Sequence, residues 1–183
     1  MKKIILSIFS ISLFTFSSWA EEEKSYLKTK DAISMNVKKY FDSSSDDDPS
    51  KFAENFYAED VEVFINDLVI KGKKNYIERL NKIHKKLIKD MKFEQLHIHT
   101  NYFSKEALAH DGKTFGEMHP NEDTTIWTNA WGTLKGVGRS SNKPISFRIH
   151  MDFRTVKGKV VEMLAYYDPT QMNEEIKALE GSN

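Results

Sequence analysis

The hydrophobic pattern of this chain changes its period near Asp90, and this change constrains the fold more than any other sequence feature. Before Asp90, apart from two short strand-like runs at residues 61–65 and 68–70, apolar side chains recur with the period of a helix that buries one side. After it, they alternate with polar side chains, as on strands that turn one face toward a core. The clearest alternation spans residues 145–156, where Phe147, Ile149, Met151 and Phe153 are interleaved with Arg148, His150, Asp152 and Arg154.

The same two patterns predict the remaining elements and the fold class. Helices are expected to begin at Asp31, at Asp48-Pro49, after Gly72 and at Asp168-Pro169. Strands are expected at residues 61–65, 68–70, 93–103, 124–137 and 160–167. Long antiparallel strands with one apolar face need helices to cover that face. The sequence therefore predicts an α+β fold, in which a curved antiparallel sheet wraps over three N-terminal helices and a short C-terminal helix follows.

Composition excludes several kinds of chemistry. The 183 residues contain no cysteine, so thiolate catalysis, iron–sulfur clusters and cysteine-ligated zinc are excluded. The 27 basic residues are balanced by 27 acidic ones, which argues against a strongly basic nucleic-acid binder. We therefore expect neither a cofactor nor a nucleic-acid partner.

The N-terminus has the three parts of a secretory signal peptide. Lys2 and Lys3 make a basic start, residues 4–16 are apolar apart from small hydroxyl residues, and Ser18-Trp19-Ala20 places small residues where a signal peptidase reads them. We expect residues 1–20 to be removed and the mature chain to be exported, to the periplasm or the medium. A stable membrane anchor is not expected, because the apolar run is shorter than the ~20 residues that span a bilayer. Residues 21–30 then predict a loose lead-in, and residues 31–183 a single domain.

Several local sequences, taken in order, resemble the nuclear transport factor 2-like superfamily and, within it, the SnoaL-like group. They are Phe56-Tyr57-Ala58-Glu59-Asp60-Val61, Gly72, Phe153-Arg154, Gly158-Lys159-Val160-Val161-Glu162 and Tyr167-Asp168-Pro169. The resemblance implies a cone-shaped sheet with a pocket between sheet and helices, and often a homodimer formed through the sheet. The group contains isomerases, polyketide cyclases, hydrolases and non-catalytic members, so the fold does not determine the function.

The resemblance also implies where catalytic groups would lie, and this chain lacks them there. The aspartate that serves as general base in the ketosteroid-isomerase-like branch corresponds to Ile65. The histidine and aspartate of the polyketide-cyclase branch correspond to Met151 and Ala165. None of these side chains can transfer a proton. The remaining catalytic candidates are Asp67, if the strand is bulged, and Tyr40, which falls near the position of a hydrogen-bonding tyrosine.

We expect a ligand pocket lined by the residues that would face the inside of such a cone: Tyr40, Phe56, Tyr57, Ile65, Trp127, Trp131, Met151, Ala165 and Tyr167. Trp127 and Trp131 share one strand face and could instead pack in the core or at an association surface. The expected function is binding of a small, largely apolar molecule, without catalysis, by a homodimer.

Two alternatives remain open. One is a SnoaL-like isomerase, cyclase or hydrolase that uses Tyr40, Asp67 or a loop histidine. The other is a homodimeric interaction domain whose core is closed. An ionisable group with a shifted pKa inside the pocket would favour the enzyme.

Histidines outside the expected pocket each have a functional and a structural interpretation. His97 and His99 share a strand face and could ligate a metal, but no third ligand is identifiable, so no metal site is expected. His150 and Asp152 resemble a catalytic pair, yet their alternation with apolar residues favours a polar outer face with ion pairs. Residues 104–123 predict a long exposed loop rich in His, Asp and Glu, whose role stays open.

Overall fold

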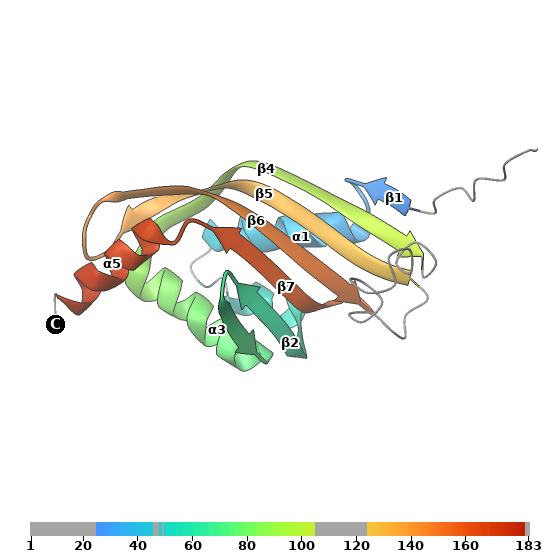
Figure 1. Ribbon diagram of the computed structural model, residues 1–183, viewed down its shortest axis with the longest axis horizontal. Helices are drawn as coiled ribbons and strands as arrows, with labels where there is room; N and C mark the ends of the chain where they lie inside the picture. The colour runs from blue at the N-terminus through green and yellow to red at the C-terminus, as the bar shows by residue number, and fades with distance from the viewer. Residues whose placement is uncertain (1–24, 46–47, 49, 105–123, 182–183) are drawn as a thin grey trace, which may run out of the picture.

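The computed structural model describes residues 25–45, 48, 50–104 and 124–181, and its fold is α+β, as expected (Figure 1). The strands are β1 (Ser25–Lys28), β2 (Tyr57–Ile65), β3 (Leu68–Lys71), β4 (Ile88–Ser104), β5 (Thr124–Gly138), β6 (Pro144–Val156) and β7 (Lys159–Tyr167). The α-helices are α1 (Ala32–Asp42), α2 (Ser50–Phe56), α3 (Lys73–Lys82) and α5 (Thr170–Glu180). A 3₁₀ turn, η1 (Ser43–Ser45), follows α1, and a π-helical turn, η2 (Ile83–Leu87), follows α3.

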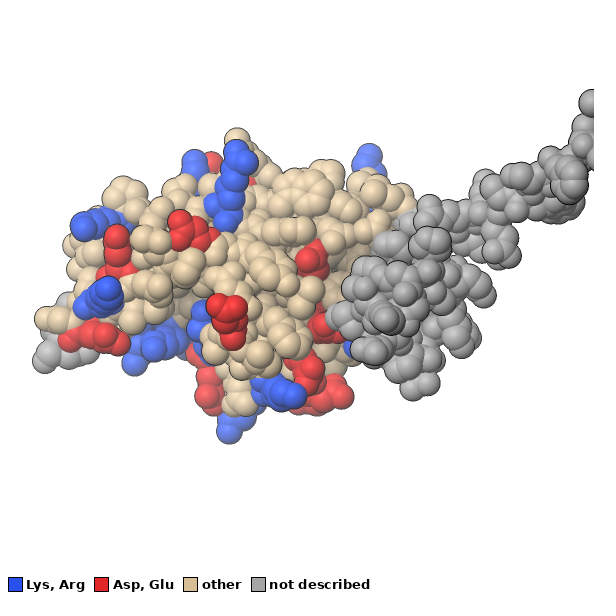
Figure 2. Space-filling model, in the orientation of Figure 1, with Lys and Arg blue, Asp and Glu red and all other residues tan. Residues whose placement is uncertain are grey.

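Two sequence-based expectations lie outside the described residues: the signal peptide, residues 1–20, and most of the long loop, residues 105–123. Within the described ranges, no helix is long and apolar enough to cross a membrane. Figure 2 shows basic and acidic side chains interspersed over the face in view.

All the strands belong to one open sheet in the order β1-β4-β5-β6-β7-β2-β3. Strands β4 to β7 form an antiparallel meander, as the sequence predicts, but β2 runs parallel to β7, with Val63 beside Met163. The expectation of an antiparallel sheet is therefore wrong for this pairing, and the sheet is mixed. Alternation reveals which face of a strand is buried but not the direction of its neighbour, because parallel and antiparallel strands share the same period.

Strand β4 bends along its length. Two register shifts interrupt its pairing with β5. Asp90 lies in the first shift and Gln95 in the second, with positive φ angles of 54° and 53°. Irregularities of this kind bend a strand and increase its twist. Figure 1 shows the sheet arching over α1 and α3, so that its inner face and the helices enclose the core.

The core is rich in aromatic rings. Phe41 of α1, Phe56 of α2 and Phe153 of β6 are all buried. The ring of Phe153 meets those of Phe41 and Phe56 edge to face, with centroids 5.9 and 5.8 Å apart. Every second side chain of β6 is buried between Ile145 and Thr155, which confirms the alternation predicted from the sequence. Helices of the N-terminal half thus pack on the apolar face of the meander.

The N-terminal segment corrects one expectation. The sequence predicts a loose lead-in over residues 21–30, but Ser25–Lys28 forms β1, which pairs with β4 at the edge of the sheet. A patternless segment can add such a strand, because the exposed edge offers main-chain hydrogen bonds that do not depend on side chains. The formation of β1 therefore depends on its pairing with β4 and not on its own side-chain pattern. Two other strands begin earlier than expected, β2 at Tyr57 and β4 at Ile88.

Candidate functional site

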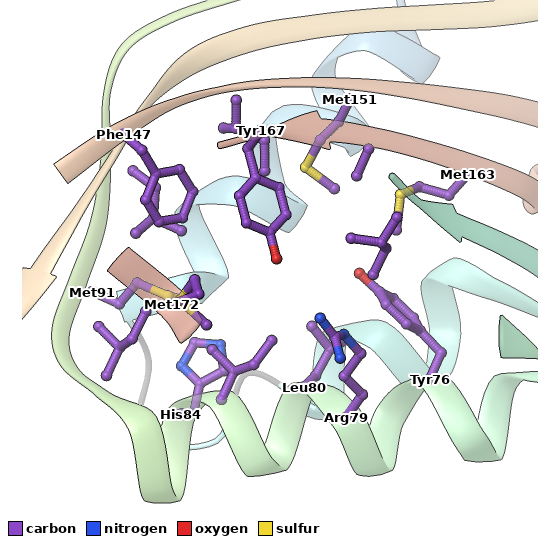
Figure 3. Close-up of a pocket in the computed structure, with 16 residues that line it drawn as sticks. Tyr76, Arg79, Leu80, His84, Met91, Phe147, Met151, Met163, Tyr167 and Met172 are labelled. Carbon is purple, nitrogen blue, oxygen red and sulfur yellow. The ribbon is translucent and has the colours of Figure 1, made fainter. Parts of the chain in front are cut away.

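A cavity of about 80 Å³ lies between α3 and the inner face of the sheet (Figure 3). Strands β2, β4, β5, β6 and β7 contribute to its wall, and α5 adds Met172. A second cavity, of about 70 Å³, lies between α3 and α5. The two cavities share Arg79, Ile83, Tyr167 and Met172, so these residues lie where the cavities adjoin.

One row of side chains forms the floor of the larger cavity. Ile65 of β2 lies beside Ala165 of β7, which pairs with Met151 of β6. All three line the cavity and are buried. These are the positions at which the resemblance to known enzymes places catalytic groups. Here they hold only hydrocarbon and a thioether, so the floor contains no proton donor or acceptor.

Polar groups enter the cavity from the helical side, where α3 and η2 lie, and from the end of β7. In Figure 3 the Arg79 guanidinium, the His84 ring and the Tyr167 hydroxyl point into the space. The Nε atom of Arg79 is buried and has no hydrogen-bond partner among the described residues. His84 lies in the π-helical turn η2, an irregularity that is frequent at functional sites. The cavity is therefore apolar with a few convergent polar groups, as ligand pockets generally are.

His84 has a perturbed acidity. Burial lowers the pKa of His84, and the positive charge of Arg139 lowers it further. Arg139 is held close by its Nε, which donates to the main-chain oxygen of His84 at 2.9 Å. A histidine whose pKa lies below the usual ~6.5 is neutral at physiological pH and can accept a proton. This is a shifted ionisable group of the kind that would favour an enzyme.

A cluster of tyrosines adjoins the cavity. Tyr76 lines it, and the hydroxyl oxygens of Tyr76 and Tyr40 lie 3.1 Å apart. Tyr57 meets both rings edge to face, and its hydroxyl is buried without a hydrogen-bond partner in the described part of the chain. Burial raises the pKa of Tyr40, and raises those of Tyr57 and Tyr76 well above their usual range. These groups stay protonated at neutral pH, so none of them is a base.

The structure separates the residues expected to line the pocket. Those on the cavity are Ile65, Met151, Ala165 and Tyr167. Tyr40, Phe56 and Tyr57 lie in the adjoining aromatic core, where the rings of Tyr40 and Phe56 stack with centroids 4.9 Å apart. Tyr40 itself does not line the cavity, but its hydroxyl contacts that of Tyr76, which does.

The tryptophans correct the expectation. Trp131 is 44% exposed on the outer face of the sheet, and its ring stacks on His97 with centroids 4.4 Å apart. Its neighbour Ala130 points inward and is buried. Trp127, at the same phase of the alternation, shares the outer face with Trp131 and does not line the cavity. The hydrophobicity of the tryptophans was misleading here. Thr128 and Ala130 are the buried residues of this stretch, so the alternation of the strand places both tryptophans on the outer face.

The catalytic candidate Asp67 lies away from the cavity. It is exposed in the turn between β2 and β3, beside Asn66, whose φ angle is 49°. Asn66 Nδ2 donates to the main-chain oxygen of Tyr167 at 3.0 Å and so fixes the turn against β7. Asp67 is therefore a turn residue, and the strand before it does not carry the aspartate inward.

The outer face of the sheet carries a row of large polar and aromatic side chains. The paired residues across β4, β5, β6 and β7 are His97, Trp131, His150 and Tyr166. His150 Nε2 lies 3.1 Å from Asp152 Oδ1 on this face. Arg154 Nε of β6 pairs with Glu162 Oε2 of β7 at 3.0 Å, which confirms the predicted polar outer face with ion pairs. Among the described residues, no group of three or more His, Asp or Glu side chains is placed to hold a metal ion.

Arg79 and His84 were missing from the expected site. Lysines dominate the polar side of α3, so the charged residues of this helix were interpreted as a solvent-exposed face. A signal was nevertheless present. Arg79 follows Tyr76 by three residues and His84 follows Leu80 by four, and both spacings place two side chains on the same helical face. Polar residues that fall on the apolar face of a predicted helix were therefore the sequence signal for polar groups in the pocket.

No protein-family model and no curated protein matches this chain. Solved structures do match. A protein assigned as a polyketide cyclase, from Pseudomonas putida, superposes with a TM-score of 0.56 at 15% identity over 78% of this chain and 96% of that one. A similarly assigned protein from Xanthomonas campestris gives 0.55 at 13% identity over 80% and 96%.

A third match is assigned as a SnoaL-like polyketide cyclase, from Jannaschia, with a TM-score of 0.53 at 13% identity over 80% of this chain and 92% of that one. The chain has the SnoaL-like fold. These matches confirm the fold that the resemblance implied, and at their low identity they show the fold alone. The function of this chain has to be argued from its own cavity.

Proposed function

We propose that this chain is an exported SnoaL-like protein that binds a small, largely apolar molecule in its cavity without transforming it. The floor of the cavity carries the proposal. Ile65, Ala165 and Met151 are buried and apolar, and they occupy the positions where the resemblance places catalytic groups. Shape and apolar contact are sufficient for binding, whereas catalysis of an acid–base reaction needs a positioned proton acceptor.

Binding can be tested with matched small molecules. The probes are benzoate, hexanoate and octanoate, each beside the corresponding alcohol, with thermal shift and calorimetry as readouts. We expect at least one probe to bind and Ala165→Leu, which fills space above the floor, to weaken its binding. Ala32→Leu makes the same change at an exposed position of α1 and should leave binding unchanged. If no probe binds, binding is contradicted and the interaction domain with a closed core is favoured.

The absence of catalysis can be tested separately. Model β,γ-enones and polyketide esters are the substrates of the two reactions that the resemblance suggests. A general acid or base contributes about 10²–10⁴-fold to such a rate, and the floor positions at which these two reactions need one hold Ile65, Met151 and Ala165, so we expect turnover near background. Saturable turnover would contradict the non-catalytic proposal.

His84 supports a second candidate, an acid–base enzyme. Its ring points into the cavity, burial and Arg139 lower its pKa, and the Tyr167 hydroxyl points into the same space as a potential donor. In this case the His84 ring would accept a proton from the bound molecule. The candidate predicts that any saturable turnover disappears in His84→Gln and persists in Asp67→Asn, because Asp67 is exposed away from the cavity.

A further inference from the structure

Arg79 is a cation for which the described residues supply no ion-pair partner, beside a largely apolar cavity. It is partly buried on the inner side of α3, and its Nε is fully buried without a hydrogen-bond partner among the described residues. No carboxylate of the described chain forms an ion pair with it. Burial of a charge is costly unless the charge is paired.

The described lining of the two cavities supplies no negative charge to Arg79. Among the described residues that line the two cavities, none is an aspartate or a glutamate. The other ionisable groups are Lys82 on the smaller cavity and His84 on the larger one, besides the tyrosines. Arg79 lines both cavities and so lies where they adjoin. An anion bound beside Arg79 would contact a positive charge and otherwise mainly apolar side chains.

We infer that the molecule bound in the larger cavity carries a carboxylate, and that Arg79 binds this group while the apolar part of the molecule lies on the floor of Ile65, Ala165 and Met151. The inference rests on the proposed binding function. A planar guanidinium matches a carboxylate and can donate two parallel hydrogen bonds to it. The Tyr167 hydroxyl, which points into the same space, is positioned as a further donor (Figure 3).

The size of the cavity limits the apolar part. The cavity has a volume of about 80 Å³. At ~10–15 Å³ for each water-sized unit, it accommodates roughly five to eight non-hydrogen atoms. The apolar parts of aromatic or short aliphatic acids fit this range, whereas the apolar part of a long-chain fatty acid or a steroid exceeds it. Benzoate, hexanoate and octanoate are therefore the appropriate probes.

The wild-type protein provides the first test. Each acid is compared by calorimetry at pH 7.5 with its alcohol, namely benzyl alcohol, hexanol or octanol. We expect the acids to bind at least about tenfold more tightly, because an ion pair with the partly buried guanidinium is available only to the anion. The ¹⁵N-resolved NMR signal of Arg79 Nε–H should shift with octanoate and not with octanol. An alcohol that binds as tightly as its acid would overturn the inference.

Variants provide the second test. Arg79→Met keeps the apolar stem of the side chain but removes the guanidinium charge, so it should abolish the preference for acids, whereas binding of the alcohols should change little. Lys74→Met removes an exposed cation from the same helix and should leave both affinities unchanged. Circular dichroism and the melting temperature without ligand show whether each variant folds. An unchanged preference in a folded Arg79→Met protein would overturn the inference.

The outcomes separate this inference from the proposed function. If alcohols bind and acids do not bind better, the cavity is a binding site, as proposed, but Arg79 is not a carboxylate anchor. If acids bind better and the preference is lost in Arg79→Met, both statements are supported. If no probe of either kind binds to the wild-type protein, both statements are contradicted.

Discussion

Adjacent side chains of β6 have opposite environments, and this gives a prediction for single residues. Met151 is buried on the cavity floor, whereas His150 is exposed on the outer face. Met151→Ala should lower the free energy of unfolding by ~2–5 kcal/mol, as other truncations of buried methionines do. His150→Ala should change it by less than about 1 kcal/mol. Denaturant melts measure both values, and the reverse ranking would mean that the strand faces the other way.

The lowered pKa of His84 gives a prediction about pH. Because burial and Arg139 lower this pKa, the folded state binds a proton less readily than the unfolded state. The stability that neutral His84 contributes is thus present above its unfolded pKa of ~6.5 and decreases as pH falls below that value. An NMR titration should place the His84 pKa below ~6.5. Arg139→Gln should raise it, and a titration at or above the unfolded value would contradict this environment.

At the scale of elements, Glu175 joins α5 to the turn between β5 and β6. Its side chain is buried and accepts from the main-chain N–H groups of Ser140 and Ser141 at 2.7 and 3.3 Å, and from the Ser141 hydroxyl. Burial alone would raise the pKa of Glu175, but these hydrogen bonds together outweigh it, so that the pKa is lowered. The contact positions α5, which carries Met172 to the cavity wall.

Glu175→Gln should therefore lower the free energy of unfolding by about 1–3 kcal/mol at neutral pH, since a hydrogen-bonded buried charge is lost. A lowered carboxyl pKa contributes stability above the unfolded value of ~4.3 and loses it as pH falls through the folded value. The difference between wild type and Glu175→Gln should accordingly shrink below about pH 4. Glu174→Gln, at an exposed neighbouring position, is the control. Equal melts for both variants at pH 7 would contradict this role.

At the scale of the whole molecule, the expected homodimer stays a prediction. The outer face of the sheet presents exposed Trp131 and Tyr166 in one row. In a two-fold dimer the same row of each copy would pack against the other. Trp131→Lys should then convert a dimer into a monomer in light scattering, whereas Leu27→Lys, at an exposed edge position, should not. A wild-type protein that is monomeric at all concentrations would exclude the dimer.

Export is also a prediction about the whole chain. The basic start and Ser18-Trp19-Ala20 predict cleavage after Ala20. Intact-mass measurement of the protein from an exporting host should give a chain that begins at Glu21. Ala20→Phe removes the small residue that a signal peptidase reads and should leave the precursor uncleaved. Recovery of a mature wild-type protein that retains residues 1–20 would contradict the prediction.

Local periodicity determined much of this protein. Alternation in residues 145–156 is enough to decide which side of β6 is buried, because adjacent strand residues point to opposite faces whatever the strand pairs with. The helical spacing after Gly72 predicts α3 in the same way, although not its π-helical end. The apolar identity of Ile65, Met151 and Ala165, and hence the missing catalytic groups, could also be stated from the sequence.

Only the tertiary structure decided which strands pair and which side chains come into contact. The parallel pairing of β2 with β7, the addition of β1 to the sheet and the outward direction of Trp131 depend on strand register and on bulges, which join residues far apart in the chain. The same holds for Arg79. Its spacing places it beside Tyr76, but its position on an apolar cavity whose described lining contains no carboxylate follows from the curvature of the sheet above α3 (Figure 1). A local window of sequence contains neither the curvature nor the register, because both arise from contacts between distant segments.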